Sequence, residues 1–236
     1  MKKILTTAIL CAGLVGFTAC DSFLDVEPKS SLTLDTYYKT SADIIGNVNY
    51  LYRDGAPDKM GNMTGAYRGS SLSVMNMVTG YFVNEYEGQE VDCSYARQLT
   101  RQDFTQSCCN YLTNDTWKSC YKSINVANAV IKYVDGVEMD NQAQYKAEAR
   151  FFRALNYFYL VKMFGDVPMV TEPTEDATLV EYPTRTAASE VFNTVIIPDL
   201  QFAVENLPNA TFAGNSHRVT KYAADMLLAD VYMRLG

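Results

Sequence analysis

Basic residues, histidine and tryptophan are scarce in this chain. There are 20 Lys and Arg against 27 Asp and Glu, a net charge of −7, with one His and one Trp. A phosphate backbone repels an acidic chain, so the composition disfavours nucleic acid, and we expect no nucleic-acid partner. His217 stands alone and no C-x-x-C pair is present, so the sequence lacks the ligand set of a zinc site.

The residues that catalysis needs are equally sparse. His217 beside Ser216 is the sole candidate for a nucleophile relay, and nothing around the pair marks it as one. The acids Glu172, Glu175 and Asp176 are typical of a solvated loop rather than of carboxylates flanking a glycosidic bond. No Gly-rich phosphate loop occurs. The sequence therefore predicts a protein that is not an enzyme and that uses no metal or cofactor.

Long apolar runs are missing except near the start of the chain. Residues 1–19 read as a signal peptide, with a basic start and an apolar stretch too short to span a bilayer. The stretch Phe17-Thr18-Ala19-Cys20 looks like a lipobox, which predicts cleavage before Cys20 and lipidation of Cys20; a plain secretory signal peptide is the alternative. Residues 20–34 are polar, acidic and interrupted by proline, as expected of an extended tether. The mature chain is thus expected to be anchored to a membrane without spanning it.

Four further cysteines follow the lipidation site. A bridge from Cys93 to Cys108 or Cys109 would staple an irregular stretch, and Cys120 is a second candidate partner. Free thiols are the other alternative, and the spacing does not choose between them.

Helical periodicity dominates the body of the chain. Apolar residues at helical spacing predict helices over 40–54, 71–83, 114–134, 186–207 and 219–235. Asn128 lies inside the apolar face of helix 114–134 and is expected to bond a neighbouring helix or loop. Pro198 should kink or break helix 186–207. By contrast, residues 84–113 show no sustained periodicity.

The stretch 147–170 predicts a helix packed on two sides. Phe151, Leu155 and Phe158 form one apolar stripe, and a second stripe lies about 100° around the helix. Gly165 then provides a cap with positive φ, and Pro168 prevents the helix from restarting. The helices form two hairpins, at about 114–164 and 186–235, which look like tetratricopeptide repeats. The sequence thus predicts an all-α fold.

The sequence of this stretch, AEARFFRALNYFYLVKMFGDVPMV, resembles the hallmark helix of the SusD/RagB family of outer-membrane nutrient-binding lipoproteins. FLDVEPKSSLT and WKSCYKSINVANAVI are similar to other parts of the family pattern, in order and spacing. The resemblance implies a SusD-like array of helical hairpins with long irregular loops. It also implies a surface-exposed, lipid-anchored protein that binds a glycan or another nutrient and hands it to a TonB-dependent SusC-like transporter.

The same resemblance implies a ligand site in the irregular stretch 84–113. There, Tyr86 and Tyr95 would stack on sugar rings, and Asp92 and Arg97 would bond hydroxyl groups. An ordinary surface loop is the alternative for these residues.

The length departs from the family pattern, because SusD-like proteins usually run to about twice this length. We therefore expect residues 35–236 to be a partial SusD-like domain without its C-terminal half. The last helix is then expected to expose Leu227, Val231 and Leu235. An envelope-assembly scaffold lipoprotein built from tetratricopeptide repeats is the alternative function.

Overall fold

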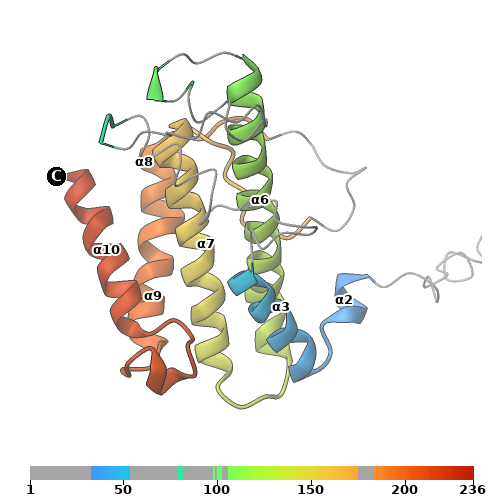
Figure 1. Cartoon of the computed structure of the whole chain (residues 1–236). Helices are drawn as coiled ribbons and strands as arrows, with labels where there is room; N and C mark the ends of the chain where they lie inside the picture. Colours follow the sequence, from blue (N-terminus) through green and yellow to red (C-terminus); the bar gives the residue numbers. More distant parts are fainter. Residues whose placement is uncertain (1–32, 54–78, 82–97, 99, 103–105, 175–182) are drawn as a thin grey trace, which may run out of the picture.

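Helices lying side by side make up the described part of the chain (Figure 1). The computed structural model describes residues 33–53, 79–81, 98, 100–102, 106–174 and 183–236. The helices α6 (Gln106–Tyr133), α7 (Gln142–Phe164), α9 (Ile197–Asn206) and α10 (Lys221–Leu235) follow one another across the molecule, each packed on the next. The shorter α3 (Ser41–Arg53) packs on both α6 and α7, and α2 (Leu34–Tyr37) precedes it. The predicted all-α fold of helical hairpins is confirmed.

Helix α3 begins where its capping residues predict. The Thr40 N–H and Oγ1 both donate to Oδ2 of Asp43, at 2.8 and 2.6 Å, which satisfies polar groups at the open helix end. Ile44, Val48 and Leu51 are fully buried on one face of the helix. This stripe packs α3 against the α6–α7 hairpin.

Helix α6 begins earlier than its apolar pattern suggests. The expected start near residue 114 is wrong, because the helix already runs from Gln106. Residues 106–113 contain no proline or glycine, so nothing in them stops the helix from extending beyond its apolar face. The irregular stretch is correspondingly shorter than predicted.

The predicted helix 71–83 also differs at its end: residues 79–81 form a turn with Gly80 at φ +77°, and residues 71–78 lie outside the described part.

Helix α7 is the central element, in contact with α3, α6, α9 and α10. Both predicted apolar stripes are largely buried, because neighbouring helices cover α7 on two sides. The helix ends at Gly165, which has φ +67° and ψ −122° and donates its N–H to the Val161 carbonyl. Val167 then pairs with Thr186 in an isolated antiparallel bridge, which joins the exit of α7 to the segment before α8.

Replacing Gly165 with alanine should lower the free energy of unfolding by about 1–3 kcal/mol. A Cβ at this position meets no other atom within 4 Å, so the loss would come from the positive φ alone. Gly136→Ala is the matched control, because its Cβ also meets open space and its φ is not positive. Urea denaturation would compare the two, and equal stabilities would contradict a role for the Gly165 backbone.

The predicted helix 186–207 is interrupted before Pro198. It consists of α8 (Ala188–Val191), a π-helical turn (Phe192–Ile196) and α9, in which Pro198 occupies the first turn. Proline lacks an N–H, and its ring clashes with the carbonyl of the preceding turn, so regular α-helical bonding cannot continue through it. The wide π turn accommodates this change.

The exposed apolar face of α10 differs from the predicted one. Val231 is fully buried, because α9 packs on that side of α10, so the expectation of an exposed Val231 is wrong. Leu227 is half-buried and Leu235 is 46% exposed. The large exposed apolar side chains of α10 also include Tyr222, Met226 and Met233, which recur at helical spacing on another side.

Helix α6 also limits the disulfide pairings. Cys108, Cys109 and Cys120 all lie on α6, where residues 11 or 12 apart are separated by about 16–18 Å. A disulfide needs Cα atoms within about 7 Å, so Cys120 bridges neither of the other two. Cys120 is buried in the core, and Cys93 lies outside the described residues.

No helix in the part of the chain that the structure describes is long and apolar enough to cross a membrane.

Candidate functional site

The ligand-binding residues expected from the sequence, Tyr86, Asp92, Tyr95 and Arg97, lie outside the described residues, as does Cys20. They remain predictions. The described helices provide a different site, which the sequence did not indicate.

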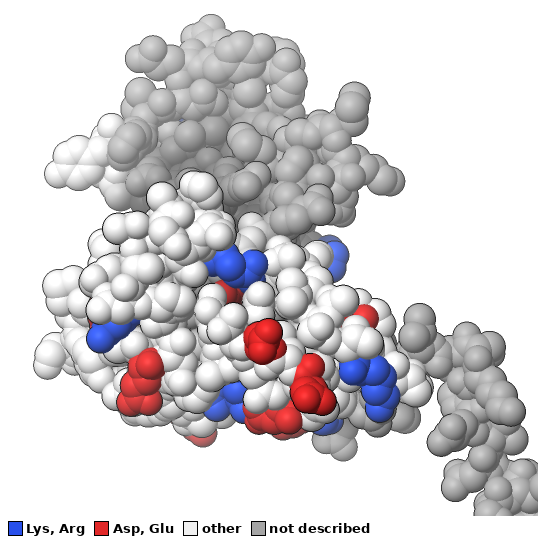
Figure 2. All heavy atoms as spheres, turned by 90° about the horizontal axis from the view of Figure 1, so that it is seen from below, with Lys and Arg blue, Asp and Glu red and all other residues white. Residues whose placement is uncertain are grey.

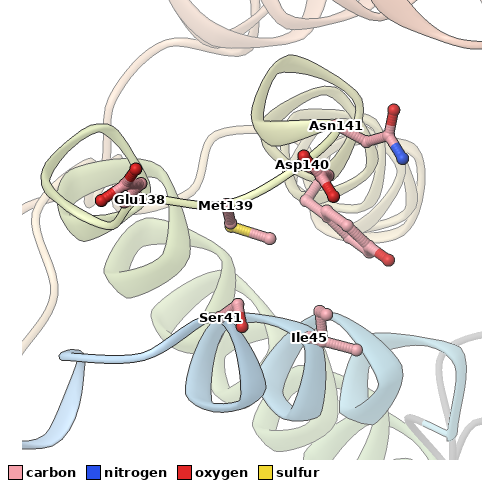
Figure 3. Close-up of a pocket in the computed structure, with 7 residues that line it drawn as sticks. Ser41, Ile45, Glu138, Met139, Asp140 and Asn141 are labelled. Carbon is pink, nitrogen blue, oxygen red and sulfur yellow. The ribbon is translucent and has the colours of Figure 1, made fainter.

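An open pocket of about 640 Å³ lies where α6 is joined to α7 (Figure 3). The segment between the two helices contributes most of its lining, and α3 faces that segment from the other side. In Figure 3, Ser41 and Ile45 of α3 point toward Met139 of this segment. We call it the link pocket; its lining residues are Ser41, Ile45, Glu138, Met139, Asp140, Asn141 and Tyr145.

Local backbone chemistry holds the connecting segment in place. After α6, a 3₁₀ turn (Val134–Gly136) ends the hairpin's first arm, and Asn141 takes the left-handed conformation directly before α7. Asparagine tolerates this conformation better than most residues. The Gln142 Nε2 donates to the carbonyls of Val134 and Val137, at 2.8 and 3.0 Å. The pocket wall is thus fixed by bonds across the turn.

The polar groups of the link pocket suit a ligand that carries hydroxyl groups. Carboxylates from Glu138 and Asp140, the Ser41 hydroxyl and the Asn141 amide line it together with apolar Ile45 and Met139. Polar groups predominate in this lining, so hydrogen bonds would contribute more to binding here than apolar contacts. Among the described residues, no Lys or Arg forms an ion pair with Glu138 or Asp140, whereas nearby Asp135 pairs with Lys146. Both pocket carboxylates can therefore accept bonds from a ligand.

A buried ion pair lies behind the pocket. The Arg218 guanidinium lies 5.3 Å from the centre of the Tyr145 ring, and its Nη2 is 2.6 Å from the Glu148 carboxylate. Tyr52 of α3 donates its hydroxyl to the same carboxylate at 2.8 Å. Burial, together with Glu148, raises the pKa of the Tyr52 phenol, so it stays a donor. This cluster ties α3, α7 and the loop before α10 to one carboxylate.

A second buried cluster lies further along α7. Arg153 donates to both carboxylate oxygens of Asp199 on α9, at 2.7 and 2.9 Å, and to the Asn128 Oδ1 on α6 at 2.9 Å. The Asn128 Nδ2 donates to the carbonyls of Val170 and Glu172. The predicted bonding of Asn128 to its surroundings is confirmed, and it reaches both a helix and a loop.

Tyrosine hydroxyls hold the exit from α7. The Tyr157 hydroxyl donates to the Val170 carbonyl and accepts the Val170 N–H, while Tyr121 donates to the Pro168 carbonyl. Burial raises the pKa of Tyr157 to about 12, so the phenol is neutral at physiological pH. The side chains of Glu148, Arg153 and Tyr157 are all buried in the helical scaffold, and none of them lines the link pocket.

The surface seen from the end of the α6–α7 hairpin carries both signs of charge (Figure 2). Acidic and basic side chains are interspersed on this face, without a continuous basic patch. No three His, Cys, Asp or Glu side chains gather into a metal site within the ranges that the structure covers. His217 is exposed and rests its ring against Phe212.

Comparison with known proteins points to one family. The SusD-like family model, described as "Starch-binding associating with outer membrane", matches residues 22–233. The SusD-like protein P2 of Formosa agariphila is 28% identical over all of this chain and 44% of its own length. A SusD-like protein of Bacteroides ovatus is 29% identical over 98% of this chain and 38% of its own length. The chain thus spans about two fifths of these relatives.

Solved structures show the same fold. A SusD superfamily protein from Parabacteroides distasonis matches with a TM-score of 0.63 and 26% identity, over 86% of this chain and 40% of that one. A structure titled "Laminarin binding SusD-like protein" matches with a TM-score of 0.66 and 24% identity, over 83% of this chain and 40% of that one. The second similarity concerns the fold alone.

Proposed function

Because this chain belongs to the SusD-like family, we propose that it captures a glycan at the cell surface and delivers it to a TonB-dependent SusC-like transporter. The observation that carries the proposal is the family match over residues 22–233, with its description as starch-binding and associated with the outer membrane. Oligosaccharide is the favoured nutrient, and the protein releases it chemically unchanged.

A lipid on Cys20 would hold the protein at the outer membrane. Cleavage before Cys20 removes the signal peptide, and residues 20–33 then connect the lipid to helix α2. The 13 Cα–Cα steps from Cys20 to Thr33 reach at most about 45 Å when fully extended. The described helices would therefore stay close to the membrane surface and to a transporter embedded in it.

The link pocket supports a neutral glycan as the ligand. Its two carboxylates accept hydrogen bonds from sugar hydroxyls and repel uronic acids and sulfated sugars. Tyr86, Asp92, Tyr95 and Arg97 would extend the same site or form another, through ring stacking and hydroxyl bonding. The acidic net charge also favours uncharged ligands over anionic ones.

Calorimetric titration of the full mature protein with soluble starch, laminarin and xyloglucan should detect binding to at least one of them, and alginate should not bind. Glu138→Ala/Asp140→Ala should weaken this binding about tenfold, because two hydrogen bonds of about 0.5–1.5 kcal/mol each are lost. Glu190→Ala, which removes an exposed acid on α8, is the matched control. No binding to any of the three neutral glycans would contradict the proposed function. Binding that the double variant leaves unchanged would instead place the site outside the link pocket.

A further inference from the structure

A second, smaller pocket of about 310 Å³ lies between α2, α3 and α6. We call it the α2 pocket. Its apolar lining includes Leu34, Val126 and Ala129, and its polar lining includes Tyr37, Asn47 and Asn125. The volume is at the lower end of the range for small-molecule sites, which suits one ring rather than a long chain.

We propose that the α2 pocket binds one neutral sugar ring, separately from the link pocket. The ligand class rests on the proposed function, whereas the location and the contacts come from the α2 pocket itself. The lining contains an aromatic ring, a hydrogen-bond acceptor and a hydrogen-bond donor, all held in place by the protein.

Tyr37 supplies the aromatic ring. It is 39% exposed, and its edge-to-face contact with Tyr38 has a centroid distance of 5.0 Å. Tyr38 is only 6% exposed and stacks on Tyr133 at 5.2 Å, so Tyr37 is held by an anchored neighbour. Among the described residues, no further ring and no cation lies over Tyr37. Tyr37 is thus a partly exposed aromatic ring in the lining of the α2 pocket, the kind of side chain that packs against the apolar face of a sugar ring.

Two amides supply the acceptor and the donor. The Asn47 Nδ2 donates to the Asp43 carbonyl at 2.9 Å and to the Tyr37 hydroxyl at 3.3 Å, which uses its hydrogens and leaves Oδ1 as an acceptor. The Asn125 Oδ1 accepts the Thr174 N–H at 2.7 Å, which leaves Nδ2 as a donor. A sugar hydroxyl both donates and accepts, so this pair matches it without any charge.

The absence of charge separates the α2 pocket from the link pocket. No Lys, Arg, Asp or Glu is among its described lining residues, whereas the link pocket has two carboxylates. A charged ligand that enters this pocket would lose its hydration and find no opposite charge, so its binding would cost free energy. A neutral, hydroxyl-bearing ring with one apolar face is the ligand that satisfies all three groups.

The test is calorimetric titration of the full mature protein with maltohexaose, laminarihexaose and a xyloglucan heptasaccharide. Tyr37→Ala removes the ring, and Asn125→Asp keeps the acceptor for the Thr174 N–H while it removes the donor. Each change should weaken oligosaccharide binding in the α2 pocket about tenfold. If the weakened binding falls below detection, the number of oligosaccharides bound per chain should instead fall by one. Tyr81→Ala is the matched control, because Tyr81 is 89% exposed and does not line the α2 pocket.

The outcomes separate the two proposals, with thermal unfolding confirming that each variant is folded. If the wild type binds an oligosaccharide and folded Tyr37→Ala and Asn125→Asp bind it equally well, the α2 pocket proposal is overturned and the proposed function stands. If the wild type binds none of the three probes, the proposed function fails, and the sugar assigned to the α2 pocket fails with it. Weakened binding in both variants, with Tyr81→Ala unchanged, supports the α2 pocket.

Discussion

Replacing Arg218 with methionine should lower the free energy of unfolding by about 3–5 kcal/mol, the usual cost of leaving a buried charge without its partner. Glu148 is fully buried, and Arg218 donates to both of its carboxylate oxygens. Tyr52 and Gln144 also donate to this carboxylate, but neither carries a positive charge. Urea denaturation at neutral pH, followed by circular dichroism, would measure the loss.

Two further variants make this test specific. Arg234→Met removes an exposed pair with Asp230, whose side chains are 45% and 39% exposed, so it should change stability by less than about 1 kcal/mol. Glu148→Met/Arg218→Met removes both charges together and should recover most of the loss. If Arg218→Met proves as stable as Arg234→Met, then Glu148 does not depend on Arg218.

The Arg218 variant should also affect the link pocket. Arg218 lies over the Tyr145 ring and donates to the Asn49 Oδ1 on α3 at 2.7 Å. Because α3 and Tyr145 both line the link pocket, loss of Arg218 loosens two of its walls. Arg218 would thus position the site without touching the ligand.

Replacing Arg153 with leucine should lower the free energy of unfolding by a similar amount, about 3–5 kcal/mol. Arg153 makes a two-bond contact with the buried Asp199 and a third bond to Asn128. Its removal would leave a carboxylate and an amide oxygen inside the packing of α6, α7 and α9. Chemical denaturation would measure the loss, and hydrogen exchange should show earlier opening of α9 relative to α6.

Arg150 is the natural control for Arg153. It also approaches Asp199, but at 3.7 Å, and its side chain is 27% exposed. Arg150→Leu should therefore lower the free energy of unfolding by only about 1 kcal/mol. Part of this loss would come from the contact with the Phe202 ring. If Arg150→Leu destabilises the protein as much as Arg153→Leu, then the two-bond geometry of Arg153 is not the source of its effect.

These two clusters explain why the hallmark stretch is so distinctive. An apolar helix packed on both sides requires only apolar stripes, which many sequences provide. Glu148 and Arg153 are buried charges within this apolar stretch, and each needs partners from other elements because the core supplies no water. Their position inside an apolar run is the signal that could have identified them from the sequence. Asn128 was identified in this way, since it interrupts the apolar face of its helix.

The link pocket carried no comparable signal. Its residues come from α3 and from the segment around 138–145, almost a hundred positions apart in the chain. Each is an ordinary polar or apolar residue in its local context, and they form a pocket only because α3 packs on both helices of the α6–α7 hairpin. The α2 pocket is similar, since Asn47 and Asn125 meet through the same packing.

Local sequence patterns determined the all-α class, the central helix and its end at Gly165, and the family, because helical periodicity, glycine at positive φ and proline act over a few residues. Tertiary structure decided the rest. Helix α6 extends beyond its apolar face, α9 covers Val231, and the charges of Glu148 and Arg153 find partners on helices distant in sequence. The two pockets arise in the same way, since the depth and lining of a pocket depend on which helices pack together. Periodicity shows that a helix has a face to bury, but the neighbour that buries it is chosen by the whole fold.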